Sequence, residues 1–242
     1  MRMKNIILVL FIVHLSAVLP LFSQKKKAIK EGEWDASTAF TYYYDSREFG
    51  TLNILTSAKG LPMDLFFWGF TDFHGDHQSD SGPTDFTRYF MEYRLLKGLD
   101  PEWTMGIDGL GLIAEYNDMN GPDNNLARFG LYHKLAYSLP WEKDGWWQTR
   151  IYPYETDGEG WQISTSYFVP FTSELSLGGF ADINFIENGK DRWVIEPQLT
   201  YKMTNHLFLA LEYRYNGYED ANPAVKGSGV ALGLEVSFWG EA

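Results

Sequence analysis

The sequence predicts an all-β protein, a transmembrane antiparallel β-barrel of 12 strands, and three observations carry that prediction. Polar and apolar residues alternate in an even number of blocks, each of roughly ten residues, as single-chain bacterial barrels require. Short and long connections alternate along the chain, which is typical of barrels with short periplasmic turns and longer external loops. Several blocks begin or end on tryptophan, a residue that favours the level of the lipid headgroups.

The first segment of the chain has the features of an export signal. Arg2 and Lys4 precede an apolar run over residues 6–19, which at about 14 residues is shorter than the roughly 20 that a spanning helix needs. Pro20 and the small Ser23 follow, and no cysteine lies near this point to accept a lipid. A buried or membrane-anchoring helix is the alternative. We expect a signal peptide over 1–23, a short periplasmic tail over 24–33 and the barrel over 34–242.

Two blocks near the C-terminus show the alternation most clearly. Within 206–216, leucine and tyrosine occupy every second position, and within 228–239, valine, leucine and phenylalanine do so. Successive side chains of a strand point to opposite faces, so each block has one apolar face and one polar face. Pro197 is awkward within its block, because proline removes one ladder donor. The expected strands are 34–44, 50–58, 64–73, 86–96, 103–116, 125–138, 146–154, 160–169, 174–186, 192–202, 206–216 and 228–239.

Connection lengths place the expected loops at two opposite ends of the barrel. Alternate connections are tight, and those between them include the longest ones, so the long loops share one side. The connection 139–145 is longer than its position predicts. The tight turns are expected at 58–62, 97–101, 170–172 and 203–205, and the longer loops at 74–85, 117–124 and 217–227.

Composition excludes one class of partner and favours another. The formal net charge of −12 falls to about −14 without the signal, since 20 basic residues become 18 against 32 acidic ones. Such acidity argues against nucleic acid, which requires a basic surface. Cysteine is absent, which a closed barrel tolerates because its backbone hydrogen bonds are satisfied between strands.

Aromatic residues point to lipid as the partner. They make up 17% of the chain, and two belts at two membrane interfaces would use them. We therefore predict a multi-pass location in the outer membrane of a Gram-negative bacterium, in contact with outer-membrane lipid. A soluble lectin-like or lipocalin-like β protein is the alternative. The tryptophans at block ends are Trp34, Trp103, Trp141, Trp161, Trp193 and Trp239.

No catalytic constellation stands out, and we predict that the protein is not an enzyme. A hydrolase would need a Ser/His pair facing the same way, whereas His133 falls on an apolar face and His206 at a turn. Histidines three positions apart in a loop are only loosely informative about metal binding. We therefore predict no metal and no cofactor. The metal-like residues of that loop are Asp72, His74, Asp76, His77 and Asp80.

Charged side chains identify the lumen face of each strand. An Arg or Lys that faces lipid at the bilayer midplane costs about 2–4 kcal/mol, so the charged face of each block is expected to point inward. The fourth, sixth and seventh strands then form a basic wall, and the ninth to twelfth form an acidic wall that Asp35 continues. Such a lumen would orient dipolar solutes, or else the charges pair across the lumen and plug it. The basic wall holds Arg88, Arg94, Arg128, Lys134 and Arg150, and the acidic wall holds Asp182, Glu196, Glu212 and Glu235.

The third expected strand places aromatic rings beside acids. In the run 64–72, Asp64 and Asp72 share a face with Phe66, Trp68 and Phe70. Rings that line a watery channel can stack with nucleobases, at about 1–3 kcal/mol per base, or with the CH faces of sugars. A bulged register or plain packing in the lumen is the alternative.

Several short motifs resemble the Tsx-type nucleoside-specific channels of the outer membrane. The stretch 67–72 (FWGFTD), which follows an Ala-Lys turn, resembles that family's aromatic-Gly-aromatic-small-Asp strand. The stretches 90–92 and 167–170 and the last alternating strand are also similar, in order and spacing over most of the chain after residue 33. The chain departs from the family by ending on Gly-Glu-Ala after Trp239 and by its trimmed loops. The stretches 179–182 and 195–198 look more like uncharacterised relatives of the same barrel.

The resemblance implies a monomeric barrel of 12 strands with a narrow, aromatic-lined pore for nucleosides. It implies Phe66, Trp68 and Phe70 as stacking residues, with Arg88, Glu92 and Arg94 as polar guides. We thus predict passive diffusion of small polar solutes, with nucleosides as the best guess; the alternative is a non-conducting barrel whose external loops bind a partner. The predicted channel residues are Phe66, Trp68, Phe70, Asp72, Arg88, Phe90, Glu92, Arg94, Trp146, Arg150, Glu212 and Arg214.

Overall fold

The computed structural model describes the chain from Trp34 onward with a few gaps. The expected signal peptide (1–23) and periplasmic tail (24–33) lie outside the described residues, as do Asp80 and Trp141. The described residues include one short 3-10 turn, η1 (Pro62–Asp64). None of them belongs to a helix long and apolar enough to cross a membrane. The described ranges are 34–79, 82, 84–120, 125–139, 144–156, 160–187, 189–220 and 227–241.

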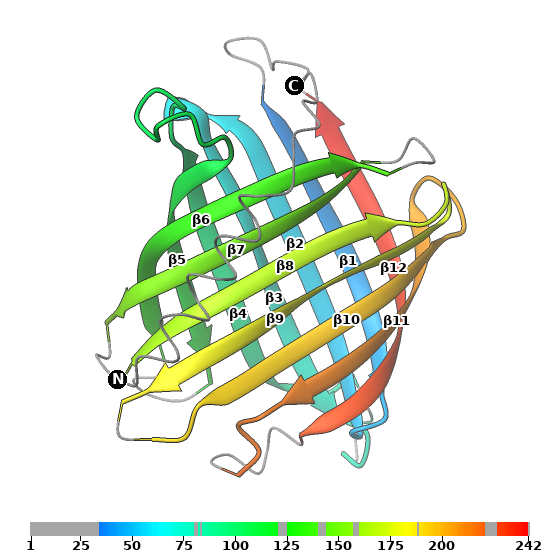
Figure 1. Cartoon of the computed structure of the whole chain (residues 1–242). Coiled ribbons are helices and arrows are strands. Elements are labelled where there is room, and N and C mark those ends of the chain that lie inside the picture. The colour runs from blue at the N-terminus through cyan, green and yellow to red at the C-terminus, as the bar shows by residue number, and fades with distance from the viewer. Residues whose placement is uncertain are drawn as a thin grey trace.

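The strands form one closed antiparallel barrel of 12 strands, which confirms the predicted fold class (Figure 1). Each strand pairs with its neighbours in sequence, and the first pairs with the last. The barrel thus has no free strand edge. The strands are β1 (Asp35–Asp45), β2 (Phe49–Leu61), β3 (Leu65–Asp76), β4 (Phe86–Gly98), β5 (Leu110–Met119), β6 (Leu126–Ser138), β7 (Asp144–Glu155), β8 (Gly160–Pro170), β9 (Leu175–Ile186), β10 (Arg192–Lys202), β11 (Leu207–Asn216) and β12 (Ser228–Glu241).

The two ends of the barrel differ. We call the end where β1 begins and β12 finishes the terminal end, and the opposite one the loop end. In Figure 1 the terminal end is uppermost for the blue and red strands. The loop end carries the long connections 77–85 and 217–227, as predicted. The first connection at that end, 46–48, is short.

The alternation predicted from sequence separates the two surfaces of the barrel wall. On β12, Leu232, Leu234 and Val236 are exposed, whereas Ala231, Gly233 and Ser237, at alternate positions, are buried. The outer surface of the strands is therefore apolar, and most of the buried polar and charged side chains face the lumen. A soluble barrel has the opposite arrangement, with apolar residues inside, and this arrangement is the one that a hydrocarbon surrounding requires.

One expected strand begins in the wrong place. The block 103–116 is wrong at its start, since β5 begins at Leu110 and residues 101–106 form turns. Gly106 and Gly109 have φ values of 83° and 79°, a conformation that interrupts an extended strand. Trp103 is 82% exposed, outside the wall. The predicted tight turn 97–101 is consequently a longer connection, 99–109, at the terminal end.

Two prolines within strands coincide with breaks in the ladder. Pro197 of β10 pairs with Gly179 of β9, which has φ of 143°, and no pairing of Glu196 or Pro197 with β11 is formed. Pro153 lies in β7, where the register with β6 shifts between Phe129 and Leu131. Each proline lacks a donor, and the wall accommodates each with a local irregularity.

Gly179 should be intolerant of a side chain. A Cβ at this position would lie 2.3 Å from the carbonyl oxygen of Glu196, and the backbone conformation is one that L residues rarely adopt. We expect Gly179→Ala to reduce the free energy of unfolding by about 1–3 kcal/mol. Gly178→Ala is the matched control, because its Cβ would meet nothing closer than 3.5 Å. Urea unfolding from lipid vesicles, followed by tryptophan fluorescence, measures both; equal effects would contradict the prediction.

Candidate functional site

An aromatic row lies on the lumen face of β3 and β4. Register pairs Trp68 with Arg94, Phe70 with Glu92 and Asp72 with Phe90, so all six side chains share one face. The ring centroids of Trp68 and Phe70 are 5.6 Å apart, and those of Phe70 and Phe90 are 5.8 Å apart. The Arg94 guanidinium carbon lies 4.7 Å from the centroid of the Trp68 ring. The row thus offers ring faces flanked by charges within the lumen.

A network of buried charges crosses β4, β5, β6 and β7 at one level of the wall. Its centre is Glu115, whose carboxylate accepts hydrogen bonds from Arg94 Nε at 2.8 Å, Arg128 Nη1 at 2.9 Å and the Tyr152 hydroxyl at 2.6 Å. Arg94 also pairs with Glu92, and Arg128 pairs with Glu155. Because every charge in this group has a partner, the network can be buried without stranding an ion.

The next strands continue the network through a serine. Arg150 Nε donates to Ser164 Oγ at 3.1 Å, and Ser164 donates to the carboxylate of Asp182. Gln162 donates to Asn184 at 2.9 Å one step closer to the loop end. Arg150 and Ser164 are almost completely buried. This chain of polar contacts, which we call the serine chain, extends the first network, centred on Glu115, over β8 and β9.

A second network joins β1 to β11 near the loop end. Asp45 pairs with Arg47 at 2.8 Å and with Arg214 at 3.7 Å, and Arg214 also pairs with Glu212. The ring of Tyr43 lies under the Arg214 guanidinium, 4.7 Å from its carbon, and packs over the space that Gly233 leaves open. Small residues on β11 and β12 therefore let Tyr43 reach β10.

The Tyr43 hydroxyl completes this second network. It donates to Gln198 Oε1 at 2.7 Å, which joins β1 to β10 across two intervening strands. On the neighbouring wall, Asn53 donates to the Asp72 carboxylate at 2.7 Å. Together the two networks form a belt of buried polar side chains around most of the lumen, which we call the charge belt.

The expected basic and acidic walls each contain charges of both signs. The glutamates Glu92, Glu115 and Glu155 lie among the arginines of the basic wall, and Arg214 lies within the acidic wall. Most of these ion pairs join residues of the same strand or of adjacent strands, whereas the pair of Asp45 with Arg214 spans β12. Arg94, Arg128 and Arg214 of the belt each pair directly with a carboxylate, whereas Arg150 reaches Asp182 through Ser164. Glu196 keeps the expected orientation, opposite Phe180 of β9.

Side chains also gather at the loop end of the lumen. Arg192 donates to the Gly217 carbonyl at 2.8 Å and pairs with Asp220, which lowers the pKa of Asp220 below its usual value. Its guanidinium lies 5.1 Å from the Tyr218 ring centroid, and burial raises the pKa of Tyr218. The start of the connection 217–227 is thereby held against β10.

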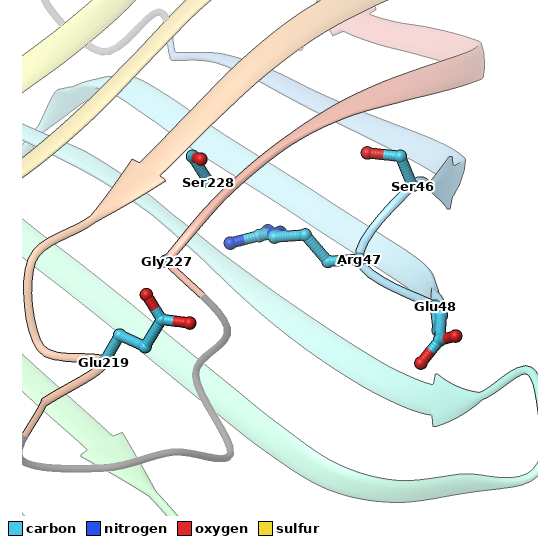
Figure 2. Close-up of a pocket in the computed structure, with 6 residues that line it drawn as sticks. All are labelled: Ser46, Arg47, Glu48, Glu219, Gly227 and Ser228. Atoms are coloured by element: carbon cyan, nitrogen blue, oxygen red, sulfur yellow. The ribbon is translucent and has the colours of Figure 1, made fainter.

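A small cavity of about 390 Å³ lies beside this connection. Figure 2 shows the Arg47 side chain extending from the β1–β2 turn toward the start of β12, with the Glu219 carboxylate on the other side. Charged side chains of both signs therefore line the cavity. It is lined by Ser46, Arg47, Glu48, Glu219, Gly227 and Ser228.

All 12 predicted channel residues occupy lumen-facing register positions, and they lie in four separate places along the wall. The residues of β3 and β4 lie together. Trp146 lies apart, opposite Phe168, with the Lys134 amine 4.9 Å from its ring centroid. Glu212 and Arg214 belong to the second network, and Arg150 to the serine chain.

Sequence reasoning missed Glu115, the central acceptor of the belt. The block that contains it was expected to begin at 103, and its inward face was not assigned. The rule that a charged face points inward would have found it, because Glu115 and Asn117 share a face with Ile113. Tyr43 and Asp45 were missed for a different reason, since their partners on β10 and β11 depend on the tilt of the strands.

The predicted histidine and aspartate group does not converge. His74 accepts or donates a hydrogen bond with Thr51 Oγ1 at 3.0 Å on the lumen face, whereas His77 stacks on Tyr44 with centroids 4.1 Å apart. Among the residues that the structure places, no three His, Cys, Asp or Glu side chains are close enough to hold a metal ion. Asp80 lies outside the described residues.

Comparison with known proteins supports the barrel fold alone. No family model and no curated protein matches the sequence. Two solved structures of the KdgM porin, one in complex with disordered oligogalacturonate, match with TM-scores of 0.52 and 0.53. Each is 11% identical, and each match covers 84% of this chain and 99% of the porin. A triple mutant of the Rhodopseudomonas blastica porin is 10% identical, with a TM-score of 0.39, over 85% of this chain and 99% of that one.

These matches do not single out the Tsx-type channels that the sequence motifs resemble. At 11% identity, the likeness to the KdgM porin concerns architecture. The chain shares the barrel fold of an outer-membrane porin.

Proposed function

We propose that this protein is a passive channel for small polar solutes in the outer membrane of a Gram-negative bacterium. The observation that carries the proposal is the inverted surface, apolar outside and polar inside, on a closed barrel whose fold is that of a porin. The apolar exterior fits outer-membrane lipid, and the polar lumen offers a path through it. A single chain closes its own barrel, so a monomer suffices.

The ends of the barrel suggest its orientation. Long connections occur in external loops of such barrels, so the loop end faces outward and the terminal end faces the periplasm. Tryptophans support two interfacial belts: Trp34, Trp103 and Trp147 belong to the terminal end, while Trp161 and Trp193 begin strands at the loop end. Trp161 stacks on Phe185 with centroids 4.0 Å apart. Aromatic rings at both ends of an apolar band are typical of membrane barrels.

The charge belt limits the size of the solute. Arginine, glutamate and tyrosine side chains are buried on the lumen face at the level of Glu115, and we expect the path beside them to be narrow. Charges of both signs at close quarters bind and release polar solutes without holding either ion class strongly. We therefore expect small uncharged or dipolar solutes to pass more readily than large ions.

Nucleosides are our best single proposal for the solute. A nucleobase can stack on the row formed by Phe66, Trp68, Phe70 and Phe90, at about 1–3 kcal/mol per base. Asp72 and Glu92 lie on the same face and can accept hydrogen bonds from base or ribose. Stacking of this strength is weak enough to release the solute, as conduction requires.

We assign the protein no catalytic role. His74 Nδ1 lies 3.0 Å from the hydroxyl of Thr51, which pairs a base with a hydroxyl group. In the described part of the chain, no carboxylate is hydrogen-bonded to the His74 ring to orient it as a triad would need.

The stacking proposal predicts an effect of single truncations. We expect Trp68→Ala and Phe70→Ala each to reduce adenosine uptake into liposomes about fivefold or more, because a base loses roughly 1–3 kcal/mol of stacking. Phe73→Ala is the control, since its side chain lies on the outer face of the same strand. Glucose uptake should change little. Unchanged adenosine uptake in both variants would contradict the stacking role but not the proposal that the protein is a channel.

A second candidate is favoured by the charge belt itself. If the buried arginines close the lumen, the barrel conducts nothing and its external loops bind a partner instead. Planar-bilayer recording separates the two functions. A channel shows single-channel steps that millimolar adenosine reduces, whereas a plugged barrel shows none.

A further inference from the structure

The terminal end of the lumen contains a cavity of about 530 Å³, which we call the vestibule. It is separate from the aromatic row, and its lumen-facing lining comes from β1, β2 and β7–β12. Its volume falls within the range of roughly 300–1,000 Å³ that small-molecule sites occupy. The cavity is therefore large enough for a solute. Its lining includes none of the predicted channel residues and shares Gln198 alone with the charge belt.

The lining is rich in hydroxyl and amide groups. Ser37, Ser176, Thr200 and Ser237 line the cavity, and Gln198 lies among them. Ser37 Oγ lies 2.8 Å from Ser57 Oγ, and Gln198 Nε2 donates to Thr200 Oγ1 at 2.9 Å. A hydroxyl both donates and accepts, so such a surface can exchange its bonds with the hydroxyls of a solute.

Apolar surface lies beside these hydroxyls. Phe168 of β8 and Phe208 of β11 both line the vestibule. Gly178 lies between them on the wall, and a Cβ there would be 4.0 Å from the nearest atom of the Phe168 ring. The glycine thus leaves the ring uncovered. Polar groups alternating with aromatic rings match a sugar ring, which carries hydroxyls at its edge and CH groups on its faces.

The charged side chains that line the vestibule favour uncharged solutes over anions. Its lining holds three carboxylates, Asp144, Glu174 and Glu235, and one amine, Lys202. This excess of negative charge repels an anion, and the low-dielectric wall strengthens the repulsion. The KdgM porin, in contrast, has been observed with oligogalacturonate, a sugar that carries carboxylates.

We propose that the vestibule is a binding subsite for uncharged polyhydroxylated solutes, such as a neutral sugar ring, and that it discriminates against uronic acids. The inference rests on the proposed channel, which supplies the route to the vestibule. It extends that function by naming a solute class and a site for it at the periplasmic end. A nucleoside carries such a ring in its ribose.

A matched pair of sugars tests the proposal. Galactose and galacturonate differ at C6, where one has a hydroxymethyl group and the other a carboxylate. With the full barrel in detergent micelles, saturation-transfer NMR should show galactose bound roughly three- to tenfold more strongly than galacturonate at low salt, with the gap closing as salt screens the charges. Equal or stronger binding of galacturonate would overturn the proposal.

Variants of the lining locate the effect. We expect Gly178→Leu to fill the vestibule and abolish galactose binding, whereas Ala58→Leu on the outer face of β2 leaves it unchanged. The pair Ser176→Ala and Thr200→Val removes hydroxyls with little change of volume and should weaken binding if Gly178→Leu does not fold. The double variant Glu174→Gln/Glu235→Gln should bring galacturonate binding close to that of galactose. Galactose binding that survives both Gly178→Leu and the hydroxyl variants would place the sugar elsewhere.

The failure of the channel and the failure of the subsite give different results. NMR detects binding whether or not the barrel conducts. If Gly178→Leu abolishes galactose binding but the barrel shows no conductance in planar bilayers, the subsite is supported and the channel is contradicted. Conductance without galactose binding would support the channel and contradict the subsite.

Discussion

Arg94→Met is expected to lower the free energy of unfolding by about 3–5 kcal/mol, the cost of breaking a buried ion pair by removing one partner. Arg94 is the buried cation that contacts both Glu92 and Glu115, and methionine preserves most of its volume but not its charge. After the substitution, the first network and the serine chain together hold four carboxylates and two guanidiniums. Urea unfolding from lipid vesicles measures the loss. The carboxylates are Glu92, Glu115, Glu155 and Asp182, and the guanidiniums are Arg128 and Arg150.

Lys97→Met is the matched control, because Lys97 lies on the same strand and on the opposite face. Its amine lies 3.5 Å from the fully exposed Asp64 carboxylate, and exposed pairs contribute about 0–1 kcal/mol. We expect its effect to stay within that range. If the two methionine variants unfold alike, the belt does not stabilise the barrel as its burial indicates.

Leu234→Arg should have the second largest effect, a loss of about 2–4 kcal/mol in lipid vesicles. Leu234 lies near the middle of β12, is 49% exposed, and faces outward between Tyr42 of β1 and Leu209 of β11. An arginine there must leave water for hydrocarbon. The same vesicle unfolding assay, with Leu234→Ala as a reference for lost packing, isolates the cost of the charge.

The control for Leu234→Arg is Met105→Arg. Met105 is 93% exposed in the connection 99–109, beyond the strands, so its replacement should change stability by less than about 0.5 kcal/mol. An aqueous surface would tolerate both arginines equally. That outcome, in a protein that stays dissolved without detergent, would contradict both the membrane location and the proposed channel.

The sequence predicted the strands well because a single rule governs them. Alternation has a period of two, and the charged face of each strand must avoid lipid, so Arg88, Glu92 and Arg94 were placed on the lumen face. The same rule failed at β5, where Trp103 and Met105 continued the apparent alternation across Gly106 and Gly109. Glycines with positive φ end a strand that hydrophobicity alone would extend.

The arrangement within the lumen could not be predicted in the same way. Contacts such as Tyr43 with Gln198 and Asp45 with Arg214 join strands that are not neighbours. They depend on how far each strand is staggered against the next around the whole barrel, and no local pattern encodes that sum. Charge pairing within the walls therefore appeared only once the register was known.

The bond between Asp45 and Arg214 also bears on how the barrel is assembled. These residues stand on either side of β12, so their contact can form only when the last strand to be synthesised meets the first. Contacts so distant in sequence form slowly. Until that meeting, both ions must remain hydrated, and the seam between β1 and β12 is expected to be the last part of the wall to enter the bilayer.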